Sequence, residues 1–285
     1  MAESLIDVRS RIASTKKTSQ ITKAMYMVSS SKVKRSQSTY QNYQDFLERI
    51  RDLVATTLSS VGEDFSYPML EERETKTTAY LLISSDTGLA GPYNTNVFKQ
   101  FEQLVSENKG NYVVWTIGRK AYSYIKGKKH PLVNTSPTLI RDDVMYVDIV
   151  PLAKQFVQAY LKGEIDKLVI VYNHFVNSLT IEVKAETLLP IKEIKAQKKE
   201  NEYLYEGGVL NIIDEIMPMY IQAVVYGIIL DAKISEHSSR MNSMKNATDN
   251  AEEVIDKLQI LYNRARQSAI TTELIDIIAG ANAVE

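Results

Sequence analysis

The stretch 230-LDAKISEHSSRMNSMKNATDNAEEVIDKLQILYNRARQSAITT-272 decides the fold of this chain. Its apolar and small residues follow alternating steps of four and three: Leu230, Ile234, His237, Met241, Met244, Thr248, Ala251, Ile255, Leu258, Tyr262, Ala265, Ala269 and Thr272. A repeat of 3.5 residues keeps one seam facing a partner helix only if the two helices supercoil left-handedly. The pattern therefore predicts a coiled coil.

The length of this helix also favours a coiled coil. A helix from near Val209 to Ile278 would be about 100 Å long at the usual rise per residue. A bundle folded back on itself would need turn signals between residues 230 and 278, and none occurs. Pro218 is expected to mark a kink or a restart of the helix, because proline removes one helical hydrogen bond.

The partner of this helix is expected at the other end of the chain. Neither proline nor glycine occurs between Met1 and Val61. Apolar side chains with helical spacing form one stripe, which includes Leu5, Val8, Ile12, Ile21, Met25, Val28, Tyr43, Leu47, Ile50, Val54 and Val61. We predict an antiparallel coiled coil of an N-terminal helix, residues 1–62, and a C-terminal helix, residues 208–285, with residues 12–28 opposite residues 251–269.

The middle of the chain, residues 75–205, has a different pattern. Short apolar or β-branched runs at 79–84, 112–117, 167–173 and 180–189 alternate with amphipathic stretches at 93–107, 119–126 and 148–162. This alternation predicts an α/β domain with a mostly parallel sheet that ends in a hairpin through Asn177 and Ser178. The fold class is thus α/β plus a long antiparallel coiled coil, with a Rossmann-like domain inserted between the two coiled-coil helices.

The block 81-LLISSDTGLAGPY-93 has the strand, glycine turn and helix with which nucleotide folds begin. The dinucleotide fingerprint G-x-G-x-x-G is incomplete, since only Gly88 and Gly91 are present, and the second strand ends in Gly118-Arg119 rather than in an acidic residue. A G-x-x-x-x-G-K-[ST] phosphate loop is also absent. We therefore predict a structural turn, with Pro92 at the first helical position and Asp86 bracing the turn.

Other catalytic chemistry is not indicated either. The chain has no cysteine, which excludes disulfides and thiolate zinc sites. His130, His174 and His237 lie too far apart in sequence for a local metal motif, and Asp142 and Asp143 are read as a solvated loop pair. No run of 18 uninterrupted apolar residues occurs, so a membrane span is not expected. We predict no cofactor, no metal and no catalysis.

Charge is unevenly distributed although the net charge is only −1. Residues 1–40 contain eight Lys or Arg residues against Glu3 and Asp7. Composition permits a transit peptide, a nucleic-acid arm or a solvated helix that faces an acidic partner.

Two terminal segments carry a resemblance to a known family. The segments 11-RIASTKKTSQITKAMYMVSSSKVKR-35 and 235-SEHSSRMNSMKNATDNAEEVIDKLQILYNRARQSAITTELIDIIAGA-281 resemble the terminal helices of the gamma subunit of F-type ATP synthase, of a bacterial, Bacillus-like type. The block 84-SSDTGLAGPYNTN-96 resembles the glycine block of that family, although Thr87 stands where the family usually has a basic residue. The resemblance covers the whole chain in order.

This resemblance implies a central rotor shaft that couples proton flow to ATP synthesis or hydrolysis and is itself non-catalytic. Its implied partners are the alpha and beta subunits of the catalytic ring, the epsilon subunit and the membrane c-ring, without nucleic acid and without insertion into the membrane. The implied location is the cytoplasmic face of a bacterial cell membrane. Residues expected to contact the stator ring are Lys23, Met25, Arg240, Arg266, Gln267, Thr271 and Glu273.

The resemblance also implies two broader surfaces. Basic side chains of the first helix would face acidic loops of the ring, among them Lys16, Lys17, Lys32, Lys34 and Arg35. The apolar tip at residues 274–284 would run in an apolar sleeve. The alternative is a nucleotide-dependent enzyme with a nucleic-acid-binding coiled-coil arm, against which the broken fingerprint and near-neutral charge count.

Overall fold

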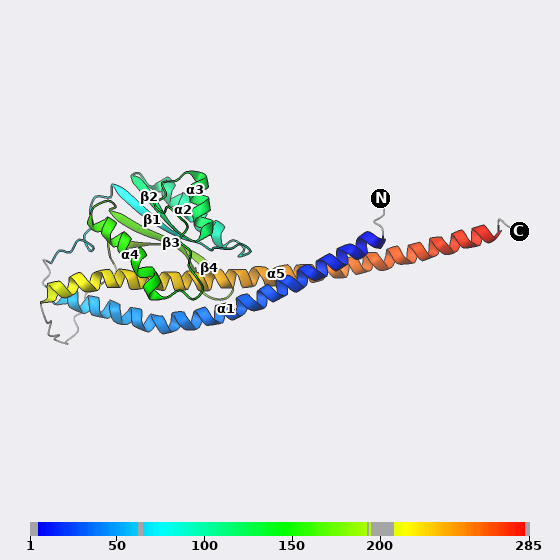
Figure 1. The fold of residues 1–285 in the computed structure, drawn as a ribbon, viewed down its shortest axis with the longest axis horizontal. Coiled ribbons are helices and arrows are strands. Elements are labelled where there is room, and N and C mark those ends of the chain that lie inside the picture. Colours follow the sequence, from blue (N-terminus) through cyan, green and yellow to red (C-terminus); the bar gives the residue numbers. More distant parts are fainter. Residues whose placement is uncertain (1–4, 62–64, 193, 195–207, 283–285) are drawn as a thin grey trace. The chain divides into compact units, whose positions relative to one another are not determined.

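The computed structural model describes residues 5–61, 65–192, 194 and 208–282. The elements run in the order α1 (Leu5–Ser59), β1 (Thr77–Ile83), α2 (Tyr93–Glu107), β2 (Asn111–Ile117), α3 (Arg119–Lys128), α4 (Tyr146–Leu161), β3 (Lys167–Phe175), β4 (Ile181–Leu189) and α5 (Val209–Asn282). Figure 1 shows the two long helices and the α/β domain. The chain divides into two compact units, residues 30–239 and residues 1–29 with 240–285.

The larger unit contains a four-stranded sheet in the order β2-β1-β3-β4. β1 pairs in parallel with both β2 and β3, and β3 pairs antiparallel with β4. Residues 176–180 join β3 to β4, which places Asn177 and Ser178 in the hairpin turn. The predicted, mostly parallel sheet and its closing hairpin are therefore confirmed.

Two apolar layers enclose this sheet. On one face, α2 and α3 contribute residues such as Val97, Phe101 and Ile125 to a cluster with Leu82 and Val171. On the other face, α4 and the first half of α5 pack on the sheet, and α1 joins this larger cluster through Val54. Near-continuous burial along β1 and β3 is expected for parallel strands covered on both faces.

The two long helices lie against each other within each unit. In the larger unit, the Tyr43 hydroxyl on α1 donates to the carbonyl of Ala223 on α5 at 2.9 Å. In the smaller unit, the hydroxyl of Thr248 on α5 donates to that of Thr22 on α1 at 2.7 Å. The partner on α5 moves toward the N-terminus as α1 proceeds, so the pairing is antiparallel. α5 runs through Pro218 as one continuous helix, so of the predicted kink or restart, the restart is wrong.

Candidate functional site

The turn after β1 is the place where a nucleotide fold would hold phosphate, and here its polar groups bind one another. The Asn94 side chain accepts a hydrogen bond from the amide of Ser85 at 3.0 Å and donates one to the Ser85 hydroxyl at 2.8 Å. The Ser85 hydroxyl in turn donates to the carbonyl of Thr87 at 2.7 Å. The turn is thus held by its own side chains.

Asp86 links this turn to the start of α3. Its carboxylate accepts a hydrogen bond from the amide of Arg119 at 3.0 Å. The next two amides of α3, of Lys120 and Ala121, donate to the Ser85 carbonyl at 3.1 Å and to the Ser84 hydroxyl at 2.7 Å. The first amides of a helix are its anion-binding groups. Since the protein itself occupies these three, the N-terminus of α3 offers no phosphate site.

The glycines of this region have unequal roles. Gly91 has φ +53°, and Leu89, two residues before it, has φ +61°, so the left-handed positions of the turn are these two. A Cβ on Gly88 would meet no atom within 4 Å. Gly118, at the end of β2, has φ +91°, and a Cβ there would lie 2.2 Å from the Ser84 carbonyl oxygen. The backbone therefore requires glycine at Gly118, which sequence reasoning noticed only as the end of a strand.

The carboxyl edge of the sheet is closed by α5. The Tyr93 hydroxyl donates to the carbonyl of Ala232 at 3.0 Å, and the Ser239 hydroxyl donates to the carbonyl of Ala90 at 2.6 Å. The Asp231 carboxylate accepts from the amide of Phe175 at 2.8 Å and lies 2.6 Å from Nδ1 of His174. Burial raises the pKa of Asp231, and its bonds to His174 and Phe175 oppose that rise.

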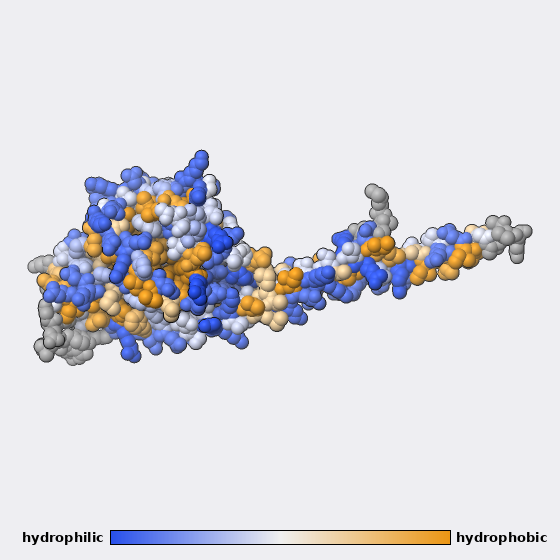
Figure 2. Space-filling view, in the orientation of Figure 1, coloured by the Kyte–Doolittle hydropathy of each residue, from blue (hydrophilic) through white to orange (hydrophobic). Residues whose placement is uncertain are grey.

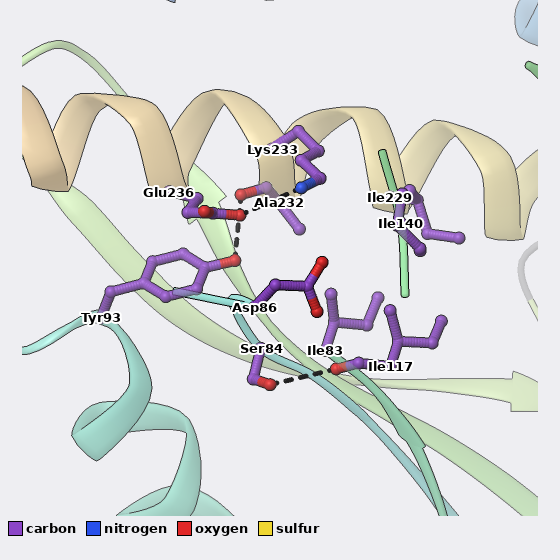
Figure 3. A pocket seen from close by; sticks show the side chains of 10 residues that line it. All are labelled: Ile83, Ser84, Asp86, Tyr93, Ile117, Ile140, Ile229, Ala232, Lys233 and Glu236. Atoms are coloured by element: carbon purple, nitrogen blue, oxygen red, sulfur yellow. Dashed lines mark hydrogen bonds and ion pairs between the residues drawn. The ribbon is translucent and has the colours of Figure 1, made fainter. Parts of the chain in front are cut away.

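Little space remains at this edge. Figure 3 shows the cavity between the ends of β1 and β2 and the helix α5, with Asp86, Tyr93, Lys233 and Glu236 around it. Its volume is about 10 Å³, which is room for about one water molecule. Ligands of open α/β sheets bind in the crevice at the carboxyl ends of the strands. Here a helix of the same chain fills that crevice.

Asp142 holds both long helices to the α/β domain. Its carboxylate lies 2.7 Å from Nζ of Lys32 on α1, 3.2 Å from Nε2 of His237 and 3.6 Å from Nζ of Lys233 on α5. Burial raises the pKa of Asp142, but the hydrogen bond from Lys32 and the charges of His237 and Lys233 outweigh it, so the pKa is lowered. Asp142 and Asp143 are exposed, as expected of a solvated loop pair. The ion pairs of Asp142 were not predicted, because its cationic partners lie far away in sequence.

A larger cavity, of about 330 Å³, lies between residues 138–145 and the first turn of α4. Its charged groups have local partners. The Asp143 carboxylate pairs with Arg141 at 2.8 Å, and Asp148 accepts a hydrogen bond from the amide of Met145 at 2.9 Å. None of these charged groups pairs a nucleophile with a general base.

The smaller unit contains the coiled-coil segments of α1 up to residue 29 and of α5 from residue 240, and the seam on α5 is correctly predicted over most of its length. Met244, Thr248, Ala251 and Leu258 are buried, whereas Ala269 and Thr272 are exposed. The predicted seam therefore extends too far along α5. The register also differs, since Thr22 meets Thr248 rather than a residue between 251 and 269.

The α1 side of this seam is made of small polar residues. Ser19, Thr22 and Ser29 are buried, whereas Ile21 and Val28 are 60% and 56% exposed. The prediction that Ile21 and Val28 belong to the buried stripe is wrong. Small hydroxyl side chains occupy the seam, and the apolar side chains next to them face outward.

Most residues predicted to contact a stator ring lie on the surface. Lys23, Arg266, Gln267, Thr271 and Glu273 are exposed, and Met25 is half-buried. Arg240 is only 8% exposed, which leaves little of its guanidinium for a partner. Exposed isoleucine and leucine side chains follow at the end of α5, as the orange patches in Figure 2 show.

Helix α5 also contains one 18-residue window that is apolar and long enough to cross a membrane, and 61% of this window is buried within the protein. Such burial is expected of a core helix. Among the described residues, no three His, Asp or Glu side chains gather as a possible metal site.

Comparisons with known proteins agree with this architecture. Residues 4–284 match the family model described as ATP synthase. The chain is 41% identical to the ATP synthase gamma chain of Exiguobacterium sibiricum over 98% of this chain and 99% of the relative. It is also 41% identical to the ATP synthase gamma chain of Macrococcus caseolyticus over 99% of both chains.

Solved structures share the fold at lower identity. The central stalk and c-ring structure of the Tetrahymena thermophila mitochondrial ATP synthase contains a chain with a TM-score of 0.62 and 24% identity, over 80% of this chain and 99% of that one. A chain of the Euglena gracilis mitochondrial ATP synthase has a TM-score of 0.66 and 18% identity, over 98% of this chain and 94% of that one. With a full-length family match, two curated relatives at 41% identity and the same fold in these assemblies, the chain belongs to the ATP synthase gamma chain family.

Proposed function

We propose that this chain turns as the central rotor shaft of an F-type ATP synthase, and that it couples proton flow through the membrane sector to ATP synthesis or hydrolysis in a ring of alpha and beta subunits. Membership of the gamma chain family supports this role. The single observation that carries the proposal is the pairing of α1 and α5 as a long antiparallel coiled coil attached to an α/β domain. A rotor shaft requires such a stiff element.

We further propose that the chain is non-catalytic within the complex. Its sheet has the topology of a nucleotide fold, but α5 fills the crevice where a nucleotide would bind. The first amides of α3 are occupied by Asp86, Ser85 and Ser84. The nucleotides then belong to the ring subunits. The same closed crevice counts against the alternative of a nucleotide-dependent enzyme with a nucleic-acid-binding arm.

The unequal faces of the coiled coil supply the basis for directed rotation. On α1, Ile21 and Val28 present apolar surface, while Lys16, Lys17 and Lys23 present charge. A ring subunit therefore meets a different surface at each angle of the shaft. Because a partner shifts a conformational equilibrium only through its differential affinity for the two states, these unequal contacts bias each ring subunit between open and closed forms.

The contact residues belong to this proposal as well. Lys23, Met25, Arg266, Gln267, Thr271 and Glu273 would touch the ring, and the apolar end of α5, with Leu274 and Ile278, would turn in an apolar sleeve. We assign residues 1–62 and 208–285 to the shaft and residues 75–205 to the body, which would contact the epsilon subunit and the c-ring. The chain would be peripheral, at the cytoplasmic face of a bacterial membrane.

Observation of rotation in single molecules tests the proposal. The chain has no cysteine, so Lys162→Cys at an exposed position creates a unique label site. In a complex of this chain with alpha and beta subunits, a bead on residue 162 should turn in one direction when ATP is added. A ring that hydrolyses ATP while the bead stays fixed would refute the rotor role.

A further inference from the structure

Helix α3 and its flanks carry a concentration of positive charge that the rotor function leaves unexplained. Residues 108–140 contain six Lys or Arg residues and no Asp or Glu, although the whole chain has a net charge of −1. Five of the six lie on α3 or directly after it and are exposed; they form the α3 basic cluster, which consists of Arg119, Lys120, Lys126, Lys128 and Lys129. The charge of this helix is therefore not balanced by its own sequence.

Tertiary contacts balance this charge only in part: burial raises the pKa of Glu102, but the bonds to Tyr124 and His130, and after them the charge of Lys128, outweigh burial and lower it. Within the part of the chain that the structure describes, no member of the α3 basic cluster forms an ion pair. Two carboxylates next to α3, Asp86 and Glu102, already have hydrogen-bond partners. Asp86 accepts the amide of Arg119, and Glu102 accepts the Tyr124 hydroxyl at 2.7 Å and lies 3.3 Å from Nε2 of His130.

The geometry of α3 fixes where these cations point. Ala121 and Ile125 are buried against the sheet, so the opposite face of the helix is exposed to solvent. Ser123 is exposed on that outer face, between the basic residues at the two ends. Arg119 and Lys126 are seven residues apart, which is about 10 Å along a helix. The outer face thus presents two groups of cations, one at each end of the helix, with the small side chain of Ser123 between them.

Two half-buried tyrosines restrict the lysine side chains. Nζ of Lys126 lies 5.6 Å from the centre of the Tyr122 ring, and Nζ of Lys128 lies 6.0 Å from that of Tyr124. The tyrosine hydroxyls are bound to the Thr135 carbonyl and to Glu102. A lysine that is held by a ring loses less conformational freedom on binding than a free one.

We propose that the α3 basic cluster is a docking surface for an acidic polypeptide segment of another subunit of the same complex. A lipid surface fits less well, because no large apolar side chain between residues 108 and 130 is exposed for insertion between headgroups. Nucleic acid fits less well because both tyrosine rings are packed against lysines and the whole chain has a slightly negative charge. Carboxylates on a protein surface match cations at fixed positions on a helix.

Zero-length carbodiimide cross-linking of the purified complex tests this proposal, because the reagent joins lysine amines only to carboxylates in direct contact. We expect peptides of another subunit linked through Asp or Glu to Lys120, Lys126, Lys128 or Lys129. The link between Lys32 and Asp142 of this chain is the internal control, because their charged atoms lie 2.7 Å apart. Absence of links from the α3 basic cluster in a sample that shows the control link would overturn the proposal.

Charge reversal in the full chain supplies the matched variant. Lys120→Glu combined with Lys126→Glu and Lys128→Glu should lower binding of the cross-linked partner at least about tenfold, since like charges across an interface repel. The control reverses three exposed lysines elsewhere in the domain, Lys99, Lys154 and Lys162, and should leave that binding unchanged. Equal losses in both variants would show a general effect of net charge and refute the site.

Two further binding measurements test whether a lipid surface or nucleic acid occupies the α3 basic cluster instead. Sedimentation of the full chain with phosphatidylglycerol vesicles, or its retention on RNA homopolymer, should not depend on the three α3 lysines. Loss of either activity in the α3 variant alone would replace the acidic polypeptide by a lipid surface or by nucleic acid. The proposal assumes that the chain acts within a complex, and rotation of residue 162 tests that assumption separately.

Discussion

Gly118 is the residue whose substitution the structure predicts to be most harmful to the α/β domain. Its backbone has φ +91° and ψ 143°, a region open almost only to glycine. A Cβ would lie 2.2 Å from the carbonyl oxygen of Ser84 and 2.5 Å from its hydroxyl oxygen. That hydroxyl accepts the amide of Ala121, a buried bond at the start of α3. Gly118→Ala must therefore move Ser84 and α3 apart.

The size of the effect follows from two costs. Forcing alanine into this backbone region costs about 1–3 kcal/mol. Leaving the buried amide of Ala121 without its acceptor costs about 1–3 kcal/mol more. We expect Gly118→Ala to lower the free energy of unfolding by about 2–6 kcal/mol, a large share of the stability of an ordinary domain.

Urea unfolding of the purified chain, followed by circular dichroism, measures this change. Two other glycines serve as controls, because a Cβ on Gly88 or Gly127 meets no atom within 4 Å. Gly88→Ala should change stability by less than about 0.5 kcal/mol, as surface substitutions usually do. Gly127→Ala, in the last turn of α3, should raise stability by at most about 0.5–1 kcal/mol, the cost of glycine relative to alanine inside a helix. A Gly118→Ala chain that unfolds at the wild-type urea concentration would refute the reasoning.

Three further predictions concern the helices. Cysteines in place of Thr22 and Thr248 should form a disulfide within one chain under oxidising conditions, which is detected as a shift in mobility on non-reducing gels. Disulfides that form only between chains would contradict the observed pairing. The pKa of Asp142 is lower in the folded chain than its ordinary value of 3.8, so its ion pairs stabilise the fold above that value and are lost as pH falls through the folded-state pKa. In the Asp142→Asn variant, the free energy of unfolding should fall less on acidification. The difference should be about 1 kcal/mol or less, because the carboxylate is half-exposed. Gln267→Leu, at an exposed position, should slow ATP turnover of the assembled complex at least several-fold while leaving the coil folded; a wild-type rate would show that this position contacts only solvent.

Sequence periodicity was sufficient to predict which segments form helices and strands. The predicted stretch at 93–107 coincides with α2, and each predicted strand overlaps an observed one. These elements are predictable because their burial pattern is local. Apolar residues repeat at the period of the element that buries them.

Pairing between distant segments was harder to predict. The 3.5-residue repeat of α5 continues to Thr272, yet burial of the seam ends before Ala269. A repeat shows which face of a helix is apolar, but its burial depends on how far the partner extends. On α1 the buried seam residues are Ser19, Thr22 and Ser29. A prediction from apolar residues alone assigned Ile21 and Val28 to the seam instead.

The candidate site was predictable mainly in outline. The incomplete glycine fingerprint indicated a structural turn, and Asp86 does link that turn to α3. The closure of the crevice by α5 could not be predicted, because the contacts of Asp231 and Ser239 join residues more than fifty positions apart. The same holds for Asp142, whose cationic partners come from both long helices.

The closed crevice has a mechanical consequence. The contacts at Asp231, Ala232 and Ser239 join one side of α5 to the end of β3, to the first residue of α2 and to the turn at Ala90. A twist of this part of α5 about its own axis would have to break all of these bonds together, because their partners belong to the same α/β domain. Each bond contributes about 0.5–3 kcal/mol. An ordinary α/β domain binds and releases a small molecule at this edge. This domain binds a helix of its own chain there, which cannot diffuse away, so the edge holds α5 against rotation relative to the domain.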